Sequence, residues 1–431
     1  MFRIFLLVLA LMQSLLVNGQ TIETIAGNGS FGLGGDGGPA TNAKLYYPND
    51  VAVDKFGNIY IANSYGQRIQ KINSSGIITT FAGGGLISAF DGAPADSVGL
   101  PRVLCVTVDD TGNVYFTTYS RAFKVNLAGR IYCIAGAGGS LVHAGDGGPA
   151  TAASFEQLYG IAIDQSGNVY LPDPFHCVVR KINTAGIINT IAGTGVCGYS
   201  TDGTVATAAR LVSPMSVRVN PAGELLIGDF GNEQIRKINA VGVMATVAGN
   251  ALFMTGCLAI DGDIGRPAGM TFDKWGNFYM VDDYHLVRKI NTADSIEIIA
   301  GTFIVAGFAG DGGPPLSAKF NNPKGVAVDN AGNIYVADRD NHRIRRISTT
   351  MGTTVPQAAN QFVMYPNPVK DILRLQCPND KNEIEIFDVM GKSVGNMVLS
   401  SRDGFVNVGH LQAGMYILKV NSVVAGKFNK Y

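Results

Sequence analysis

The chain has 431 residues, and its 33 Lys and Arg balance 33 Asp and Glu, so the formal net charge of zero gives no indication of a basic surface for nucleic acid. Glycine accounts for 55 residues, roughly twice its usual share of about 7 per cent, and charged residues for only 15 per cent. This length and composition predict one large, turn-rich β domain together with a smaller one.

The first 19 residues have the features of an export signal. Arg3 precedes an apolar run that begins at Ile4, and the segment ends in small or polar residues near Gly19. A membrane-spanning helix needs about 20 apolar residues, and this run stops at Asn18. We therefore expect residues 1–19 to be cleaved and the exported chain to keep no membrane span.

One pattern recurs along the middle of the chain: two apolar residues and Asp, two variable residues, then Gly, Asn, an apolar residue and Tyr. Its marker positions are Asp54, Asp109, Asp164, Asn220, Asp273 and Asp329, at spacings of 55, 55, 56, 53 and 56 residues. The copy at Asn220 departs most, because Glu224 stands where the others have Asn. A repeat of this kind indicates an array of equal structural units.

Each unit contains four apolar runs separated by turn residues, which predicts a four-stranded meander and, by repetition, the blade of a six-bladed β-propeller. An extra copy of the fourth strand, Thr21 to Ala26, precedes the first unit, and the last unit ends after its third strand at Ile347. We expect the N-terminal strand to complete the last blade and close the ring. A solenoid is the alternative, but solenoids need distinct capping repeats, and none is visible.

The sequence AGDGGPA at residues 144–150, with GVAVDNAGNIYVAD and NHRIRRI in the last unit, resembles the NHL repeat of bacterial secreted propellers. The resemblance covers residues 21–350. We assign the propeller to residues 20–350.

After Ile347 the sequence becomes polar and small, and residues 351–361 are predicted to be a linker. Residues 362–431 then carry short alternating strands, typical of a small β-sandwich. The motifs YPNP from Tyr365, DVMGK, LxxGMY and the terminal KFxK resemble the C-terminal sorting domain of the type IX secretion system of Bacteroidota. The resemblance implies contact with that machinery and export through the periplasm to the cell surface or the medium.

In a propeller of this type, the loops leaving the outer strands and the loops between the second and third strands are expected on one face. The first set carries a repeated Asp-Gly at Asp36, Asp91, Asp146, Asp202, Asp261 and Asp311. A ring of carboxylates could bind a structural Ca²⁺. The alternative, which we favour, is that each Asp hydrogen-bonds the turn backbone.

The second set of loops carries His176, His285 and His342. Their convergence would make a zinc site, but they belong to different units, so we expect solvated loop histidines and no zinc. Lyases among the relatives use histidines that line the central channel, and the predicted inner strands here contain none.

Six cysteines are present, and export permits disulfides. Cys197 and Cys257 lie in corresponding loops of neighbouring units, and they are the pair predicted to form a bridge.

These features together predict an exported propeller that acts as a non-catalytic binding scaffold for an extracellular protein or glycan and requires no cofactor. The alternative is a metal-dependent lyase or a lactonase-like hydrolase of the NHL type, since one fold hosts many activities.

Overall fold

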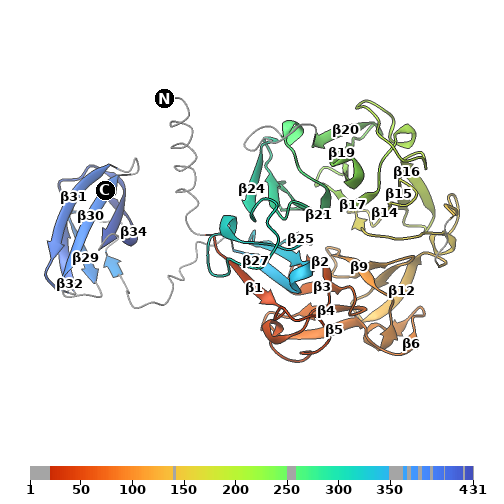
Figure 1. The fold of residues 1–431 in the computed structure, drawn as a ribbon, viewed down its shortest axis with the longest axis horizontal. Coiled ribbons are helices and arrows are strands. Elements are labelled where there is room, and N and C mark those ends of the chain that lie inside the picture. Colours follow the sequence, from red (N-terminus) through yellow and green to blue (C-terminus); the bar gives the residue numbers. More distant parts are fainter. Residues whose placement is uncertain are drawn as a thin grey trace. The chain divides into compact units, whose positions relative to one another are not determined.

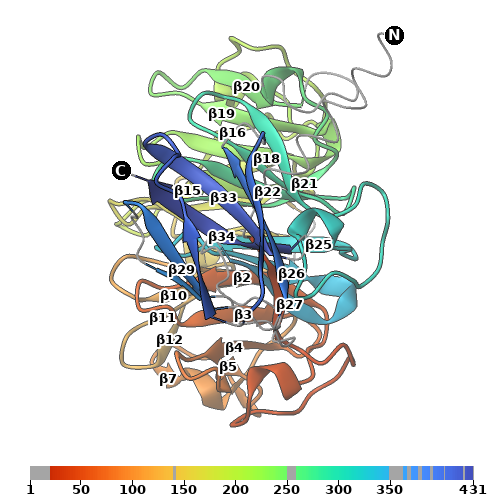
Figure 2. The ribbon, with the colours of Figure 1, turned by 90° about the vertical axis from the view of Figure 1, so that its left-hand side faces the viewer.

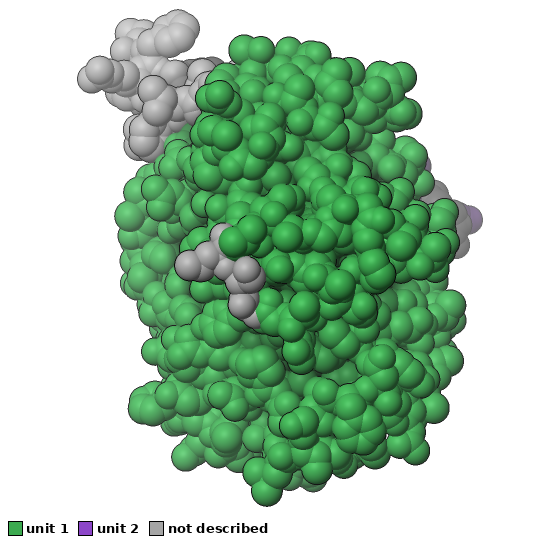
Figure 3. Space-filling view, turned by 90° about the vertical axis from the view of Figure 1, so that its right-hand side faces the viewer, with its two compact units in different colours: residues 1–352 green, residues 353–431 purple. Residues whose placement is uncertain are grey.

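The computed structural model describes residues 20–138, 142–249, 259–348, 363–365, 370–376, 381–388, 392–401, 403–420 and 423–430. The predicted export signal, the predicted linker and Cys257 lie outside the described residues. The chain divides into two compact units, residues 1–352 and residues 353–431, which Figure 3 distinguishes by colour. Among the described residues, no helix is both long and apolar enough to span a membrane.

The described part of the first unit contains six antiparallel sheets arranged around a central axis, with β2, β9, β17, β21 and β25 toward the middle of Figure 1 and β5, β12, β16, β20 and β24 at the periphery. Numbered in chain order, blade 1 consists of β2 (Pro48–Val53), β3 (Ile59–Asn63), β4 (Arg68–Ile72) and β5 (Ile78–Gly83), and blade 2 of β7 (Ala93–Pro94), β9 (Val103–Val108), β10 (Val114–Thr118), β11 (Ala122–Val125) and β12 (Arg130–Ala135). Blade 3 consists of β13 (Ala162–Ile163), β14 (Val169–Asp173), β15 (Val178–Ile182) and β16 (Ile188–Ala192), and blade 4 of β17 (Pro214–Val219), β18 (Leu225–Asp229), β19 (Gln234–Ile238) and β20 (Met244–Ala248). Blade 5 consists of β21 (Pro267–Phe272), β22 (Phe278–Asp282), β23 (Val287–Ile290) and β24 (Ile296–Ala300), and blade 6 of β25 (Pro323–Val328), β26 (Ile334–Asp338), β27 (Arg343–Ile347) and β1 (Ile22–Ala26).

Short elements occupy the connections between these strands. A parallel pair, β6 (Ile87–Ser88) and β8 (Val98–Gly99), precedes blade 2. The described 3₁₀ turns are η1 (Ala40–Asn42), η2 (Ala95–Ser97), η3 (Ala150–Ala152), η4 (Ala206–Ala208), η5 (Phe230–Asn232), η6 (Ala259–Asp261), η7 (Pro315–Ser317) and η8 (Arg339–Asn341).

The ring is closed by the N-terminal strand, as the sequence predicted. β1 pairs antiparallel with β27, with Ile22 opposite Ile347 and Thr24 opposite Arg345. The Ser348 amide donates to the Thr21 carbonyl at 2.9 Å, which extends the pairing to the end of the blade. This pairing covers an edge of β27 that would otherwise present unpaired backbone groups.

The repeated Asp of each unit shapes the turn between the first two strands. Asp54 Oδ1 accepts the amides of Phe56 and Asn58 at 2.9 Å, and Oδ2 accepts the Asn58 side-chain amide and the Tyr60 hydroxyl. Burial, followed by the neighbouring Asp54 carboxylate, raises the pKa of Tyr60. Blade 4 preserves this turn by a different pair, because Asn220 accepts the Glu224 amide at 2.8 Å.

Neighbouring blades pack through apolar side chains between their sheets. Leu45 and Ile61 of the blade 1 segment pack in one buried cluster with Ala337 and Ile344 of blade 6, and all four are fully buried. Full burial of a side chain of the size of Leu or Ile stabilises the fold by about 1.5–3 kcal/mol. The core is therefore distributed between the blades.

The described part of the second unit contains two antiparallel sheets, some of whose strands are labelled in Figure 2. Their strands are β28 (Val363–Tyr365), β29 (Ile372–Gln376) and β32 (Asp403–Asn407) in one sheet, and β30 (Asn382–Asp388), β31 (Ser393–Leu399), β33 (Gly414–Val420) and β34 (Val423–Lys430) in the other. Leu373, Ile384, Val406 and Leu418 are buried in one core. This arrangement confirms the predicted small β-sandwich.

Closure by β1 predicts which end of the chain supports the propeller. Deletion of residues 21–26 is expected to destabilise the propeller strongly, and Ile22→Ala alone should cost about 2–5 kcal/mol because Ile22 is fully buried. Deletion of residues 363–430 is the matched control, since that unit has its own core. Urea denaturation measures both, and equal midpoints for the two deletions would contradict the role of closure.

Candidate binding surface at the mouth of the channel

The predicted loop carboxylates lie along the outer strands. Five of them accept a backbone N–H from the outer strand of a blade, in the pairs Asp36 with Thr80, Asp91 with Cys133, Asp146 with Thr190, Asp202 with Thr246 and Asp311 with Thr24. The Asp261 side chain lies outside the described atoms. Because each carboxylate contacts a different blade at its periphery, these five do not gather at the channel. The structural Ca²⁺ stays a prediction.

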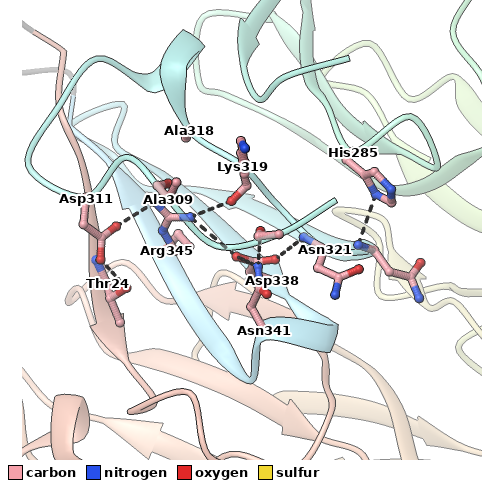
Figure 4. A network of polar contacts seen from close by, with 12 residues as sticks. Thr24, His285, Ala309, Asp311, Ala318, Lys319, Asn321, Asp338, Asn341 and Arg345 are labelled. Carbon is pink, nitrogen blue, oxygen red and sulfur yellow. Dashed lines mark hydrogen bonds and ion pairs between the residues drawn. The ribbon is translucent and has the colours of Figure 1, made fainter. Parts of the chain in front are cut away.

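Buried arginines give these carboxylates a structural role, as Figure 4 shows for blade 6. Arg345 is fully buried; its Nη2 lies 2.6 Å from Asp311 Oδ1, and its Nη1 lies 3.5 Å from Asp338 Oδ2. The same guanidinium donates to the carbonyls of Ala309 and Lys319 at 3.0 and 3.1 Å. Arg180 and Arg236 bind Asp146 and Asp202 in the same way. These ion pairs connect the loop that precedes each of these blades to the third strand of the same blade.

The three histidines singled out from the sequence are not brought together. His285 Nδ1 accepts the Asn322 amide at 3.2 Å, and His342 Nδ1 accepts the Tyr47 amide at 3.4 Å. Each of these two histidines links its loop to the next blade. His176 lies in the loop between β14 and β15, with Nδ1 2.9 Å from Asp173 Oδ1.

The predicted bridge between Cys197 and Cys257 is wrong, because Cys197 is bonded to Cys177. The partner lies in the same blade: Val179 of β15 pairs with Ala192 of β16, so Cys177 lies close to the segment that leaves β16. The two Cα atoms are 5.3 Å apart, within the range of about 4.4–6.8 Å that a disulfide requires. Sequence reasoning compared loops between blades and overlooked strand pairing within one blade.

Aromatic side chains gather where the loops of blades 6 and 1 meet. The aromatic cluster consists of Phe31, Tyr46, Tyr47, Tyr65 and His342. The ring centroids of Tyr47 lie 5.0 Å from Tyr65 and 4.7 Å from His342, and Phe31 is 66% exposed. Such contacts fix the ring planes. Phe31 is exposed and the three tyrosines are partly exposed, whereas His342 is buried.

Two arginines border this cluster. The Arg102 guanidinium carbon lies 3.5 Å from the centroid of the Tyr65 ring, and Nη1 donates to the Tyr119 hydroxyl at 2.8 Å. Arg339 lies 4.7 Å from the centroid of Tyr47 and pairs with Asp340 at 2.6 Å. Arginine stacked on a ring keeps its charge and its outer N–H groups available. The aromatic cluster with Arg102, Tyr119, Tyr159 and Arg339 is called the mouth surface below.

The mouth surface borders a small cavity on the axis of the ring. Equivalent residues of the six inner-strand segments line the cavity: Asn49, Leu104, Tyr159, Met215, Ala268 and Lys324. Its volume of about 40 Å³ has room for water but not for a substrate, since one water needs at least about 10–15 Å³ on this measure. A ligand larger than a few waters therefore does not fit inside the axial cavity.

Beneath this ring lies a buried carboxylate. Asp50 accepts the Val51 and Val106 amides at 2.9 and 3.0 Å and the Cys105 thiol at 2.8 Å. Burial raises the pKa of Asp50, and burial, followed by the Asp50 charge, raises the pKa of the Cys105 thiol well above its usual range. A thiol with a raised pKa forms little thiolate and is a poor nucleophile, so the pair serves packing.

Comparison with known sequence families separates the chain into the same two parts. The family described as "Secretion system C-terminal sorting domain" matches residues 363–430. The NHL repeat family matches residues 320–347, and the family "Teneurin NHL domain" matches residues 20–98 and 138–200. The chain is an NHL propeller with a type IX sorting domain.

The NHL propeller also resembles part of much longer proteins. Human teneurin-1 is 27% identical over 371 residues, which cover 76% of this chain but only 13% of teneurin-1. Teneurin-3 of Danio rerio is 30% identical over 255 residues, 51% of this chain and 9% of that protein. The similarity is thus to one segment of these teneurins.

Solved structures share the fold. A structural genomics protein of unknown function from Bacteroides thetaiotaomicron has a TM-score of 0.58 and 21% identity, covering 77% of this chain and 76% of that one. An auxiliary nutrient binding protein from Bacteroides ovatus has a TM-score of 0.56 and 15% identity, covering 77% of each chain. At these identities the likeness concerns the architecture of the NHL propeller.

The buried aspartates of the NHL propeller predict a pH dependence. Asp229 accepts the Val212 amide and the Asn232 side chain, each at 2.7 Å, and burial raises the pKa of Asp229 to about 6. Because the folded chain then binds a proton more readily than the unfolded chain, the stability contributed by this group is greatest at low pH and is lost as pH rises toward 6.

Asn63 occupies the equivalent position in blade 1, where its Oδ1 accepts the Tyr46 amide at 2.8 Å, so Asp229→Asn suits the repeat. We expect the stability of the wild type relative to this variant to rise by about 2 kcal/mol between pH 7 and pH 4. Urea denaturation at both pH values measures the difference, and parallel pH profiles would contradict it.

Proposed function

We propose that the NHL propeller is an exported, non-catalytic binding scaffold whose mouth surface holds an extracellular glycan or protein. The observation that carries the proposal is the gathering of part-exposed aromatic rings and two stacked arginines beside the axial cavity. The sorting domain indicates export by the type IX system to the cell surface or the medium. Such a destination suits a protein that captures a ligand outside the cell.

The chemistry of the mouth surface favours a glycan. Aromatic faces carry partial negative charge and attract C–H groups of the kind that cover one face of a sugar ring. Arg102 and the tyrosine hydroxyls offer hydrogen bonds at the edges of these rings. Tyr47 and Tyr65 are held by their neighbours, so little conformational entropy is lost when a ligand binds.

A protein ligand is the second class, since Tyr and Arg are also the residues that dominate protein interfaces. Structural neighbours from Bacteroides carry the description auxiliary nutrient binding protein, which is consistent with a binding role on this fold.

The residues around the axial cavity argue against catalysis at this place. The cavity measures about 40 Å³, and no histidine is among the described residues that line it. The Cys105 thiol is kept protonated by burial and by Asp50. The metal-dependent lyase or lactonase-like hydrolase considered from the sequence therefore gains no support from the axial cavity.

Substitutions on the mouth surface test the proposal against extracellular polysaccharides immobilised as an array. Tyr65→Ala and Arg102→Ala are each expected to weaken binding at least about tenfold, equivalent to about 1.4 kcal/mol, because each removes one member of the stacked pair of Arg102 and Tyr65. Phe56→Ala is the matched control, since Phe56 is 70% exposed beneath Lys55 at the opposite end of blade 1.

Equal loss in all three variants would contradict binding at the mouth surface. Retention of a surface protein by the wild type, with no polysaccharide bound, would assign the site to a protein ligand.

Removal of the sorting domain tests whether this domain directs export of the propeller. Without residues 363–430, the propeller is expected to fold but to accumulate in the periplasm of a host that has the type IX machinery, because the matched sorting domain is missing. Fractionation and immunoblotting measure the distribution. Normal appearance of the truncated chain at the surface would show that the domain is not needed for export.

A further inference from the structure

Blade 3 departs from the repeat at the end of its second strand. In blades 4 and 6, the aspartates Asp229 and Asp338 each accept a hydrogen bond from the side chain of an Asn three residues later, at 2.7 and 2.8 Å. In blade 3 the aspartate is Asp173, and the residue three positions later is His176. The His176 Nδ1 atom lies 2.9 Å from Asp173 Oδ1.

A second departure lies in the loop that enters the same blade. Phe308 and Tyr199 stand three residues before Asp311 and Asp202, and their rings lie under Arg345 and Arg236 at 4.9 and 5.7 Å. The residue three positions before Asp146 is His143. Its ring centroid lies 5.4 Å from that of His176, so both departures meet at one place.

The two histidines and Asp173 form a cluster of metal-ligand type. One ligand atom from each of His143, Asp173 and His176 can be chosen so that all three lie within 4.8 Å of one another. Asp173 is fully buried. Its Oδ2 atom and the His143 Nδ1 atom are buried without a hydrogen-bond partner among the described residues. A buried acceptor without a partner costs about 1–3 kcal/mol, and an ion is one of the agents that can remove that cost.

We propose that His143, Asp173 and His176 bind one divalent transition-metal ion, with Zn²⁺ as the ion that fits the ligand set. Two imidazoles and a carboxylate are a common zinc set, and imidazole is a poor ligand for Ca²⁺. Zinc ligand bonds of about 2.0–2.2 Å require the three ligand atoms to move closer together. The remaining position is available to water or to a donor group of a bound ligand.

The local charges are compatible with a cation. Arg180 acts electrostatically on His143 and Asp173, and its guanidinium lies 2.6 Å from the Asp146 carboxylate, which offsets its charge. The Asp173 carboxylate then supplies the negative charge for the ion.

The fold holds two of the ligands firmly. Asp173 is the last residue of β14, and His176 precedes the buried Cys177, whose bridge to Cys197 anchors the loop. The site is distinct from the mouth surface and from the set of His176, His285 and His342, with which it shares only His176. It extends the proposed function and does not depend on it.

The repeat itself supplies variants that should fold. His176→Asn introduces the residue found at this position in blades 4 and 6. His143→Phe introduces the residue found at its position in blade 6. The full chain, stripped with a chelator and dialysed, is titrated with ZnCl₂ by calorimetry and with CoCl₂ by visible absorption. We expect one zinc per wild-type chain and a loss of affinity of at least about tenfold in each variant. His285→Asn is the control and should bind zinc as the wild type does.

Thermal unfolding with and without zinc gives an independent readout, since an ion that binds only the folded state raises the Tm. Zinc should raise the Tm of the wild type and of the control but not of the two variants. The proposal is overturned if the wild type binds no stoichiometric zinc, if both variants keep wild-type affinity, if His285→Asn loses affinity equally, or if Ca²⁺ displaces zinc at equal concentration.

Discussion

Antiparallel pairing between β1 and β27 holds the first strand of the propeller against the last, and the other features of this unit depend on it. The axial cavity needs all six inner segments in one ring. The aromatic cluster likewise joins the two ends of the propeller, because Tyr47 and Tyr65 come from blade 1 and His342 from blade 6. The mouth surface thus exists only in the closed ring.

Residues that recur in most units have structural roles. The turn aspartates accept backbone amides, and the loop aspartates bind outer strands and buried arginines, as Asp311 does with Arg345. Their carboxylates are already engaged, which leaves little for a ligand. The two proposed binding sites lie where single units depart from the repeat, as with Tyr65 and Arg102 beside the channel and His143 in blade 3.

The strands, the blades and the closure were predictable because the repeat period and the turn residues act locally, and the extra copy at Thr21 to Ala26 indicated the closing strand. The partner of Cys197 was missed because it depends on which loop lies beside β16. His143 and the aromatic cluster were missed for the same reason, since loop residues far apart in sequence meet only in the fold. An alignment of the six units by position would have exposed His143 and His176 as departures.

The partners in the closing pair are separated by almost the whole propeller, since Thr21 and Ser348 lie 327 residues apart. A chain that emerges with its N-terminus first therefore presents β1 long before β27 is available. Until then the strand remains an open edge that can pair with other chains. An incomplete chain therefore leaves β1 with unpaired backbone groups, and these groups find their partners only when β27 has been made.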